Sequence, residues 1–258
     1  MKKLIYLIPL LAFIPSVALG AVSFVQSTST DCGKVTQCTI TFGSPTTAGD
    51  FFVVSSWIVA QNRTVTVTST QGDSFSNAFK IEAPTTAETG IYYAPNVGGG
   101  TTSLSVSISG AAAFMDFIIA EYSGVAASNP LDKVSTSTAT SAHPTTGSVT
   151  TSNANELLVS IAGSNDNGEN INSVGTPWTF DRSQLCINVG KCLADAYLVA
   201  TSTLTTSSTF TMSQSAVEAA GLATFNAATS SPANSTSSDE LSISSGNLQI
   251  SGGNLSIQ

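Results

Sequence analysis

One sequence pattern occurs twice in this chain, and it constrains the fold more than any other feature. The segment TTAGDFFVVS, which contains Asp50, returns as TSNANELLVS, which contains Glu156, 106 positions later. Each copy leads from small polar residues through an acid into large apolar residues, Val and Ser. Further on, GIYYAP around Tyr92 corresponds to DAYLVA around Tyr197, and FIIAEYSG corresponds to AGLATFNA. The repetition predicts two related halves, at about residues 46–124 and 151–226.

Alternating apolar and polar residues with high β-branched content predict an all-β protein. Leu104, Val106 and Ile108 alternate with serines, as in a strand with one buried face. Phe51–Val59 and Phe114–Glu121 are apolar on both faces and are expected to be central strands covered on both sides. The predicted strands are Val22–Gln26, Cys38–Phe42, Phe51–Val59, Thr64–Thr68, Ser74–Ile81, Gly90–Ala94, Ser103–Ser109, Phe114–Tyr122, Gly147–Thr150, Glu156–Ala162, Trp178–Asp181, Ala194–Thr201, Thr209–Ser213 and Val217–Phe225.

Many short strands separated by Gly, Asn and Pro turns favour an antiparallel β-sandwich with jelly-roll-like character over residues 21–227. One sandwich made of both halves is preferred to two in tandem, because no Pro/Gly linker separates the halves. The Ser/Thr-rich stretch Leu131–His143 is expected to cross the surface between them. Short helical turns are expected at Gly110–Phe114 and Ser215–Ala220.

The two ends of the chain differ from this body. Residues 1–20 have the pattern of a signal peptide, with Lys2 and Lys3 before an apolar stretch and small residues at the cleavage site after Gly20. That stretch is too short and too interrupted by proline for a membrane span. Residues 228–240 are expected to be a flexible linker. Residues 241–258 contain SSGNLQI followed at once by SGGNLSI, which predicts a short strand-turn tail.

The charge balance excludes a nucleic-acid backbone as the partner. Without Lys2 and Lys3, six basic residues face sixteen acids, a formal charge of −10, whereas phosphate binding needs clustered Lys and Arg. Charged residues are 9% of the chain, against a usual share of about 25%. Ser and Thr take their place, which fits an exported β-protein, secreted or on a cell surface.

Four cysteines form two closely spaced pairs, and oxidation is the expected state in an exported chain. Four cysteines allow three connectivities. Local pairing, Cys32 with Cys38 and Cys186 with Cys192, is favoured because both pairs are six residues apart and flank polar loops.

Several of these motifs resemble a recurrent secreted β-sandwich unit of environmental bacterial exported proteins and phage-associated proteins. The resemblance covers about residues 21–226 and implies a β-sandwich, with no activity and no catalytic residues to carry over. The cysteine loops and the C-terminal repeat are outside it. The motifs are AEYSGV at Ala120–Val125, NPLD at Asn129–Asp132, TAGDFFV at Thr47–Val53, YAPNVGG at Tyr93–Gly99 and TSNANELLV at Thr151–Val159.

Enzyme signatures are largely missing, so the chain is expected not to be an enzyme. The single histidine, His143, precedes a proline in a Ser/Thr loop, and no nucleophile-elbow or phosphate-loop motif is present. Asp116 and Glu121 differ by an odd number on one expected strand and so point to opposite faces. A Ca²⁺ site at Asp166, Asn167 and Glu169 is an alternative to a plain turn, because the loop is rich in oxygen ligands. No other cofactor is expected.

Aromatic residues are the candidates for ligand binding. Trp178, Tyr92, Tyr197 and Trp57 could stack on sugars if exposed, and core packing is the alternative for each. Trp57 shares a strand face with Phe51 and Val53, which favours the core. Trp178, after a proline at a loop exit, is the better surface candidate.

The sequence favours a non-catalytic extracellular or surface binding and adhesion module, with glycans as the candidate ligand. The first alternative is a structural subunit of a virion or filament that assembles through its C-terminal strands, residues 241–258. The second alternative is a secreted glycan-active enzyme. No membrane span is expected after signal cleavage.

Overall fold

The computed structural model describes residues 21–84, 87–164, 170–184, 192–229, 242–244 and 247–249. The described residues form antiparallel strands and no helix, so none offers a helix able to cross a membrane. The contacts divide the chain into two units, the body of residues 20–228 and a second unit of residues 1–19 and 229–258. The expected signal peptide, residues 1–20, lies outside the described residues.

The first half of the body contains a five-stranded and a three-stranded sheet. The large sheet has the order β1-β8-β3-β6-β5 and the small one the order β2-β7-β4. The strands are β1 (Ser23–Val35), β2 (Gln37–Thr41), β3 (Phe51–Ile58), β4 (Val65–Ser69), β5 (Ser76–Glu82), β6 (Glu88–Ala94), β7 (Ser103–Ile108) and β8 (Ala113–Ser123).

The second half contains another five-stranded sheet, in the order β13-β14-β11-β17-β9, and two two-stranded sheets, β10-β15 and β12-β16. The strands are β9 (Leu131–Ser141), β10 (Val149–Thr150), β11 (Leu157–Ser164), β12 (Ile171–Val174), β13 (Thr179–Gln184), β14 (Cys192–Val199), β15 (Thr205–Thr206), β16 (Phe210–Met212) and β17 (Ala216–Phe225).

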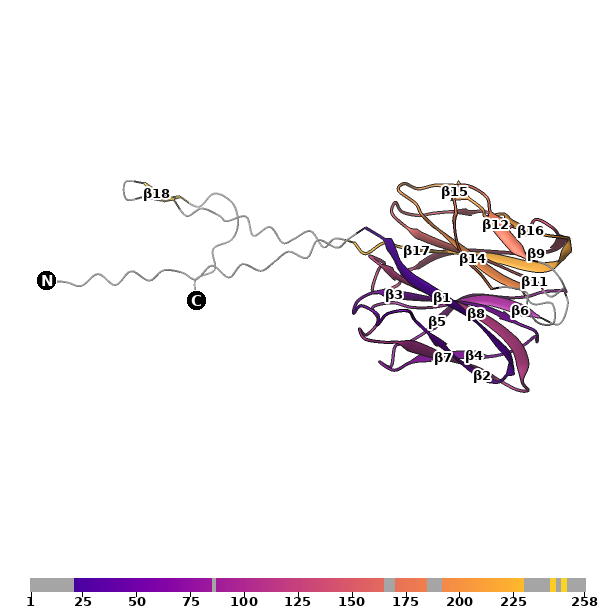
Figure 1. Cartoon of the computed structure of the whole chain (residues 1–258). Coiled ribbons are helices and arrows are strands. Elements are labelled where there is room, and N and C mark those ends of the chain that lie inside the picture. The colour runs from indigo at the N-terminus through magenta and orange to yellow at the C-terminus, as the bar shows by residue number, and fades with distance from the viewer. Residues whose placement is uncertain are drawn as a thin grey trace. The chain divides into compact units, whose positions relative to one another are not determined.

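The body has four layers, as Figure 1 shows, with the two large sheets in the middle and the small sheets outside. The large sheets face each other with β1 over β13, β8 over β14, β3 over β11, β6 over β17 and β5 over β9. Three cores fill the spaces between layers: a central core shared by both halves, and one outer core in each half. The body therefore differs from the expected single sandwich. Each half is a two-layer sandwich of one large sheet and small outer strands, and the large sheets of the two halves also pack face to face.

The two large sheets have matching strand orders. Each strand of the first sheet has a counterpart at the same place in the second sheet: β1 corresponds to β9, β8 to β17, β3 to β11, β6 to β14 and β5 to β13. The registers also correspond, since Phe51 pairs with Tyr122 and Leu157 pairs with Phe225. One detail differs from the expected alignment: Val53 pairs with Tyr93 and Val159 with Tyr197, so Tyr93 rather than Tyr92 occupies the position of Tyr197.

The strands expected to be covered on both sides lie in the two middle layers. Every residue of β3 is buried, and β8 is buried from Met115 to Tyr122. Trp57 lies in the central core against Gly163 of β11, which holds the corresponding position in the second half. A side chain at residue 163 would overlap the indole, so a large residue on one strand is matched by the smallest on the other.

Three expectations about local structure were wrong. Gly110–Phe114 is not helical, because Gly110 lies in a turn at φ 79° and β8 begins at Ala113. Ser215–Ala220 leads into β17, where sheet pairing overrides the helix propensity of its alanines. Leu131–His143 is mostly strand β9, which alternation of apolar residues could not reveal because its side chains are largely Ser and Thr.

The disulfide Cys32–Cys38 is confirmed and links the adjoining strands β1 and β2. Cys192 is also disulfide-bonded, whereas the expected partner Cys186 lies outside the described residues. In the second unit, β18 (Ser242–Ser244) pairs antiparallel with β19 (Asn247–Gln249), so the part of the tail that the structure describes is a short hairpin. Residues 230–240 of the expected linker and the remainder of the tail lie outside the described residues.

Candidate functional site

The expected aromatic platform does not form, because three of its four members are buried in three different cores. Trp57 is fully buried in the central core, Tyr92 lies in the outer core of the first half, and Trp178 lies in the outer core of the second half. The indole N–H of Trp178 donates to the carbonyl of Ser207 at 3.0 Å, which anchors it internally. Burial raises the pKa of Tyr92, with a further contribution from the charge of Glu88.

Tyr197 is the remaining member, and it is half-buried where the edges of the two large sheets meet. Its ring stacks on that of Phe24 of β1, with centroids 5.2 Å apart and planes 7° apart. Tyr122 meets both rings edge-on, at 5.8 Å from Phe24 and 5.7 Å from Tyr197. Aromatic residues from both halves therefore gather between β1, β8 and β14.

Beside this aromatic group, Ser27 of β1 is held by two residues of β13. The hydroxyl of Ser27 donates to Oδ1 of Asp181 at 2.7 Å and accepts from Nε of Arg182 at 2.8 Å. Nη2 of Arg182 also donates to the carbonyl of Ser27 at 2.6 Å. These bonds join residues more than 150 positions apart and tie the edge of one half to the edge of the other. We call Phe24, Ser27, Asp181, Arg182, Asp195 and Tyr197 the seam cluster.

Asp195 is the buried acid of the seam cluster, with 2% of its surface exposed. Burial raises its pKa well above the usual range, and the nearby charge of Asp181 adds to the effect. Ser55 donates to its Oδ2 at 3.3 Å, while its Oδ1 has no hydrogen-bond partner among the described residues. Burial likewise raises the pKa of Asp181, although Ser27 and Arg182 oppose the shift. Asp195 is therefore too buried to meet a substrate.

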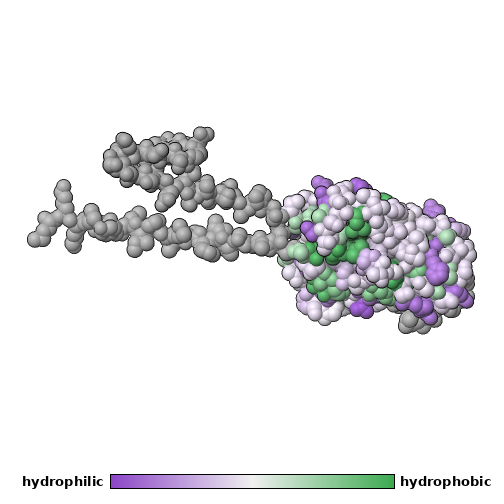
Figure 2. Space-filling view, turned by 90° about the horizontal axis from the view of Figure 1, so that it is seen from above, coloured by the Kyte–Doolittle hydropathy of each residue, from purple (hydrophilic) through white to green (hydrophobic). Residues whose placement is uncertain are grey.

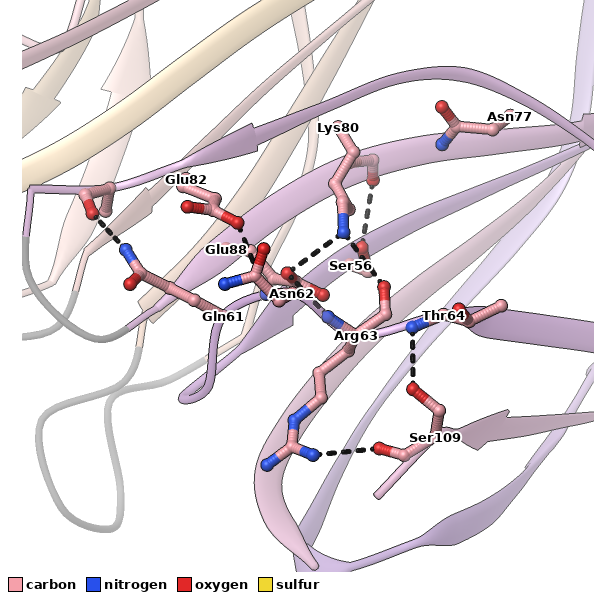
Figure 3. A network of polar contacts seen from close by, with 12 residues as sticks. Ser56, Gln61, Asn62, Arg63, Thr64, Asn77, Lys80, Glu82, Glu88 and Ser109 are labelled. Carbon is pink, nitrogen blue, oxygen red and sulfur yellow. Dashed lines mark hydrogen bonds and ion pairs between the residues drawn. The ribbon is translucent and has the colours of Figure 1, made fainter. Parts of the chain in front are cut away.

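A second polar group, shown in Figure 3, fixes the loop between β3 and β4. Lys80 lies 3.3 Å from Oε2 of the buried Glu88, and it donates to the carbonyl of Arg63 at 2.9 Å. The amide of Arg63 donates to the same Glu88 oxygen at 3.2 Å, and Gln61 donates to the carbonyl of Ala83. Burial raises the pKa of Glu88, and Arg63 and Lys80 partly offset that rise. The charged side chains of Lys80 and Glu88 therefore hold the backbone of Arg63 in place, which is a structural role.

Asp50 and Glu156, the acids that open the two repeats, lie in different hydrogen-bond arrangements. Thr47 donates its amide to Oε1 of Glu121 at 2.8 Å, and Asp50 shares a side-chain hydrogen bond with Glu121. Burial and this acidic neighbour raise the pKa of Asp50 to about 7. In the second half, Glu156 itself accepts the amide of Asn153 at 2.7 Å. A carboxylate therefore accepts a backbone amide before the first middle strand of each half, from Glu121 in the first half and from Glu156 itself in the second.

Sequence reasoning missed the seam cluster apart from Tyr197. The signal was present in DAYLVA, because Asp195 shares a strand face with Leu193 and Tyr197 and an acid at an inward position of a strand is unusual. The proximity of Ser27 to Asp181 had no sequence signal, since it depends on how the sheets pack.

The candidate metal ligands and the single histidine of the sequence analysis are the last residues to place. No group of three or more His, Cys, Asp or Glu side chains there could hold a metal ion, and the candidates Asp166, Asn167 and Glu169 lie outside those ranges. His143 is exposed, and its amide donates to Ser141 in a local turn. No protein-family model, curated protein or solved structure matches the chain.

Proposed function

We propose that the protein is a non-catalytic, exported structural module that assembles with copies of itself through a sheet edge. The observation that supports this is β9, an 11-residue strand at the edge of its sheet. From Val134 to Ser141 it has no charged residue, and Val134, Thr136, Thr138 and Thr140 are exposed on one side. A long, uncharged edge strand is a template for pairing with another chain.

The other edges of the large sheets are less suited to pairing. β1 contains two register shifts and carries Asp31 and Lys34, and β5 contains one register shift and carries Lys80 and Glu82. The remaining edge, β13, contains one register shift and carries Asp181 and Arg182. Bulges and charges are the devices by which proteins block strand addition at an edge. In β9 the register shift and the charged residues Asp132 and Lys133 lie at the beginning of the strand, and Val134–Ser141 has neither, so β9 is the favoured edge.

The surface chemistry agrees with a module that meets other protein surfaces. Figure 2, which views the body from the side of the second half, shows mostly near-neutral surface with few strongly hydrophilic residues and an apolar area. Val174, Phe180, Leu198 and Leu204 are half-buried apolar residues of the second half. Low surface charge makes contacts between copies inexpensive in desolvation. The disulfide Cys32–Cys38 fits an oxidising, extracellular location.

The test is the mass of the mature chain, residues 21–258, measured by light scattering over a hundredfold range of concentration. Self-assembly predicts oligomers whose size rises with concentration. A monomer throughout, at pH 5 and at pH 7.5, would contradict the proposal.

Binding of glycans is the second candidate, and the seam cluster favours it. The half-buried stack of Phe24 and Tyr197 lies near the exposed Arg182, which combines aromatic rings with a polar side chain. Binding to a glycan array by the wild-type chain, lost in Phe24→Ala and kept in Phe75→Ala, would support it. Equal binding by both variants, or none by the wild type, rejects this site.

A further inference from the structure

The C-terminal tail, residues 241–258, contains strand-forming segments. Two of its segments, β18 and β19, pair with each other as a two-stranded sheet. Such a hairpin is marginal in water without further partners. The sequence places apolar residues two apart three times, a spacing that would put each pair on one face of an extended strand: Leu241 and Ile243, Leu248 and Ile250, and Leu255 and Ile257.

We infer that residues 241–257 of a second copy add to the free edge of β9 as an antiparallel strand. The inference rests on the proposed self-assembly and names its donor and its acceptor. Neither partner has a charge to desolvate, because 241–258 and Val134–Ser141 both lack Asp, Glu, Lys and Arg. Backbone hydrogen bonds supply the affinity in this mode of recognition, with little demand on side chains.

A strand added at β9 would lie beside the central core, where its apolar side chains could be buried. On β9, Thr136 and Thr138 pair with Gly221 and Ala219 of β17 and share the face of the sheet that bears the central core. Strand β5 lies over β9, and its Ile81 is half-buried against that core. A strand next to β9 that points its leucine and isoleucine pairs to this face would lengthen the central core beyond β5.

Geometry favours a second copy over the chain's own tail. The body ends beside the first residue of β9, since Phe225 pairs with Leu131 and Asn226 donates to the carbonyl of Pro130. A tail that followed β9 directly would therefore run parallel to it, whereas every described pairing is antiparallel.

Antiparallel pairing within one chain would need residues 229–240 to cover the length of β9 first. That strand of 11 residues is roughly 37 Å long. Twelve residues reach at most about 43 Å when fully extended, which leaves almost nothing for crossing the edge and turning. A tail from another copy meets no such limit. Because donor and acceptor are different surfaces, the contact is head-to-tail and produces open chains or rings.

The experiment separates donor from acceptor by mixing two defective variants. The donor-deficient variant lacks residues 239–258. The acceptor-deficient variant carries a proline in β9, which removes one backbone N–H. Because the N–H groups of adjacent residues point to opposite sides of a strand, Ser137→Pro and Thr138→Pro are both made, and one of them removes an N–H on the free edge. The variant that melts like the wild type is the one whose proline faces the free edge. Proline at Thr28 or Ser29 of the corresponding edge β1, selected in the same way, is the control.

We expect the wild type and the β1 control to form oligomers, and each defective variant alone to remain monomeric, with association at least about tenfold weaker. Mixed in equal amounts, the two defective variants should form a dimer and nothing larger.

Several outcomes would overturn the inference. If the proline variant of β9 still forms oligomers while the tail deletion is monomeric, the acceptor is another surface, and only the proposed self-assembly stands. A tail deletion that assembles like the wild type would remove the tail as donor. A tail protected from protease in a monomer would show docking within one chain, and a monomeric wild type would reject self-assembly itself.

Discussion

At the scale of single residues, the acids are the unusual feature of this protein, because many of them lie inside it. Asp195 is buried between the large sheets and Glu218 in the outer core of the second half. Burial alone raises the pKa of Glu218 to about 7, and its Oε2 has no hydrogen-bond partner within the described ranges. The matched position in the first half is Met115, since Ile58 pairs with Met115 as Ser164 pairs with Glu218.

Glu218→Met should therefore remove a pH-dependent loss of stability. Between pH 4.5, the usual pKa, and pH 7, the unfolded state releases a proton that the folded state retains, so stability falls as pH rises. We expect the variant to gain about 2 kcal/mol at pH 8 relative to pH 4, allowing for partial screening. Urea unfolding at the two pH values measures this. Glu218→Gln is the control for charge without added apolar surface, and an unchanged pH dependence in both variants would refute the argument.

At the scale of elements, the middle strands β3 and β11 determine how the halves fit. Their apolar faces were evident in FFVVSSWI and LLVSIAGS, but the matching of Trp57 with Gly163 was not. The two residues hold corresponding positions in the repeat, so two identical halves would place two large or two small residues together there. Divergence of the repeat at this position is what allows the close contact.

Gly163→Ala should destabilise the body by roughly 1–3 kcal/mol, because the added methyl group overlaps the Trp57 indole. Combining it with Trp57→Leu should cost less than the sum of the two single changes, since the smaller side chain makes room. Thermal unfolding of the four proteins gives the coupling. Gly175→Ala is a matched control, because its nearest atom would be 3.7 Å away. Strict additivity would show that the contact does not carry the effect.

At the scale of the whole molecule, the central core makes the two halves dependent on each other. It contains Phe51, Trp57 and Ile91 from the first half and Leu157 and Phe225 from the second. Separating the halves would expose these side chains on both large sheets, at a cost of roughly 1.5–3 kcal/mol for each large apolar residue.

Residues 21–127 and 128–229 expressed separately should therefore be insoluble or aggregated, and coexpression should restore a soluble complex. Copurification through a tag on one fragment, followed by circular dichroism, tests this. Two separately soluble fragments with sharp unfolding transitions would show instead that each outer core suffices. Fragments of the same lengths with Trp57→Lys provide a control, because a charge in the central core should prevent reassociation.

The whole protein should also be more stable in mild acid than at neutral pH. Burial raises the pKa of most described acids with a resolved shift, whereas that of the more exposed Asp132 is lowered. A raised pKa means that the folded state holds protons which the unfolded state loses as pH rises above about 4, so stability falls toward pH 8. The melting temperature at pH 4.5 should exceed that at pH 8, and the reverse order would contradict this. The acids concerned are Asp50, Glu88, Glu156, Asp181, Asp195 and Glu218.

The sequence alone determined the all-β class, most strand positions and the Cys32–Cys38 link, because alternation and cysteine spacing are local properties of the chain. It could not reveal β9, whose hydroxyl-bearing residues resemble a loop, nor the burial of Trp178, which depends on a separate outer core. Tertiary structure decided the four layers, the seam cluster and the buried state of the acids. These depend on which sheet faces meet, and sheet packing brings together residues such as Ser27 and Asp181 whose separation along the chain leaves no local pattern.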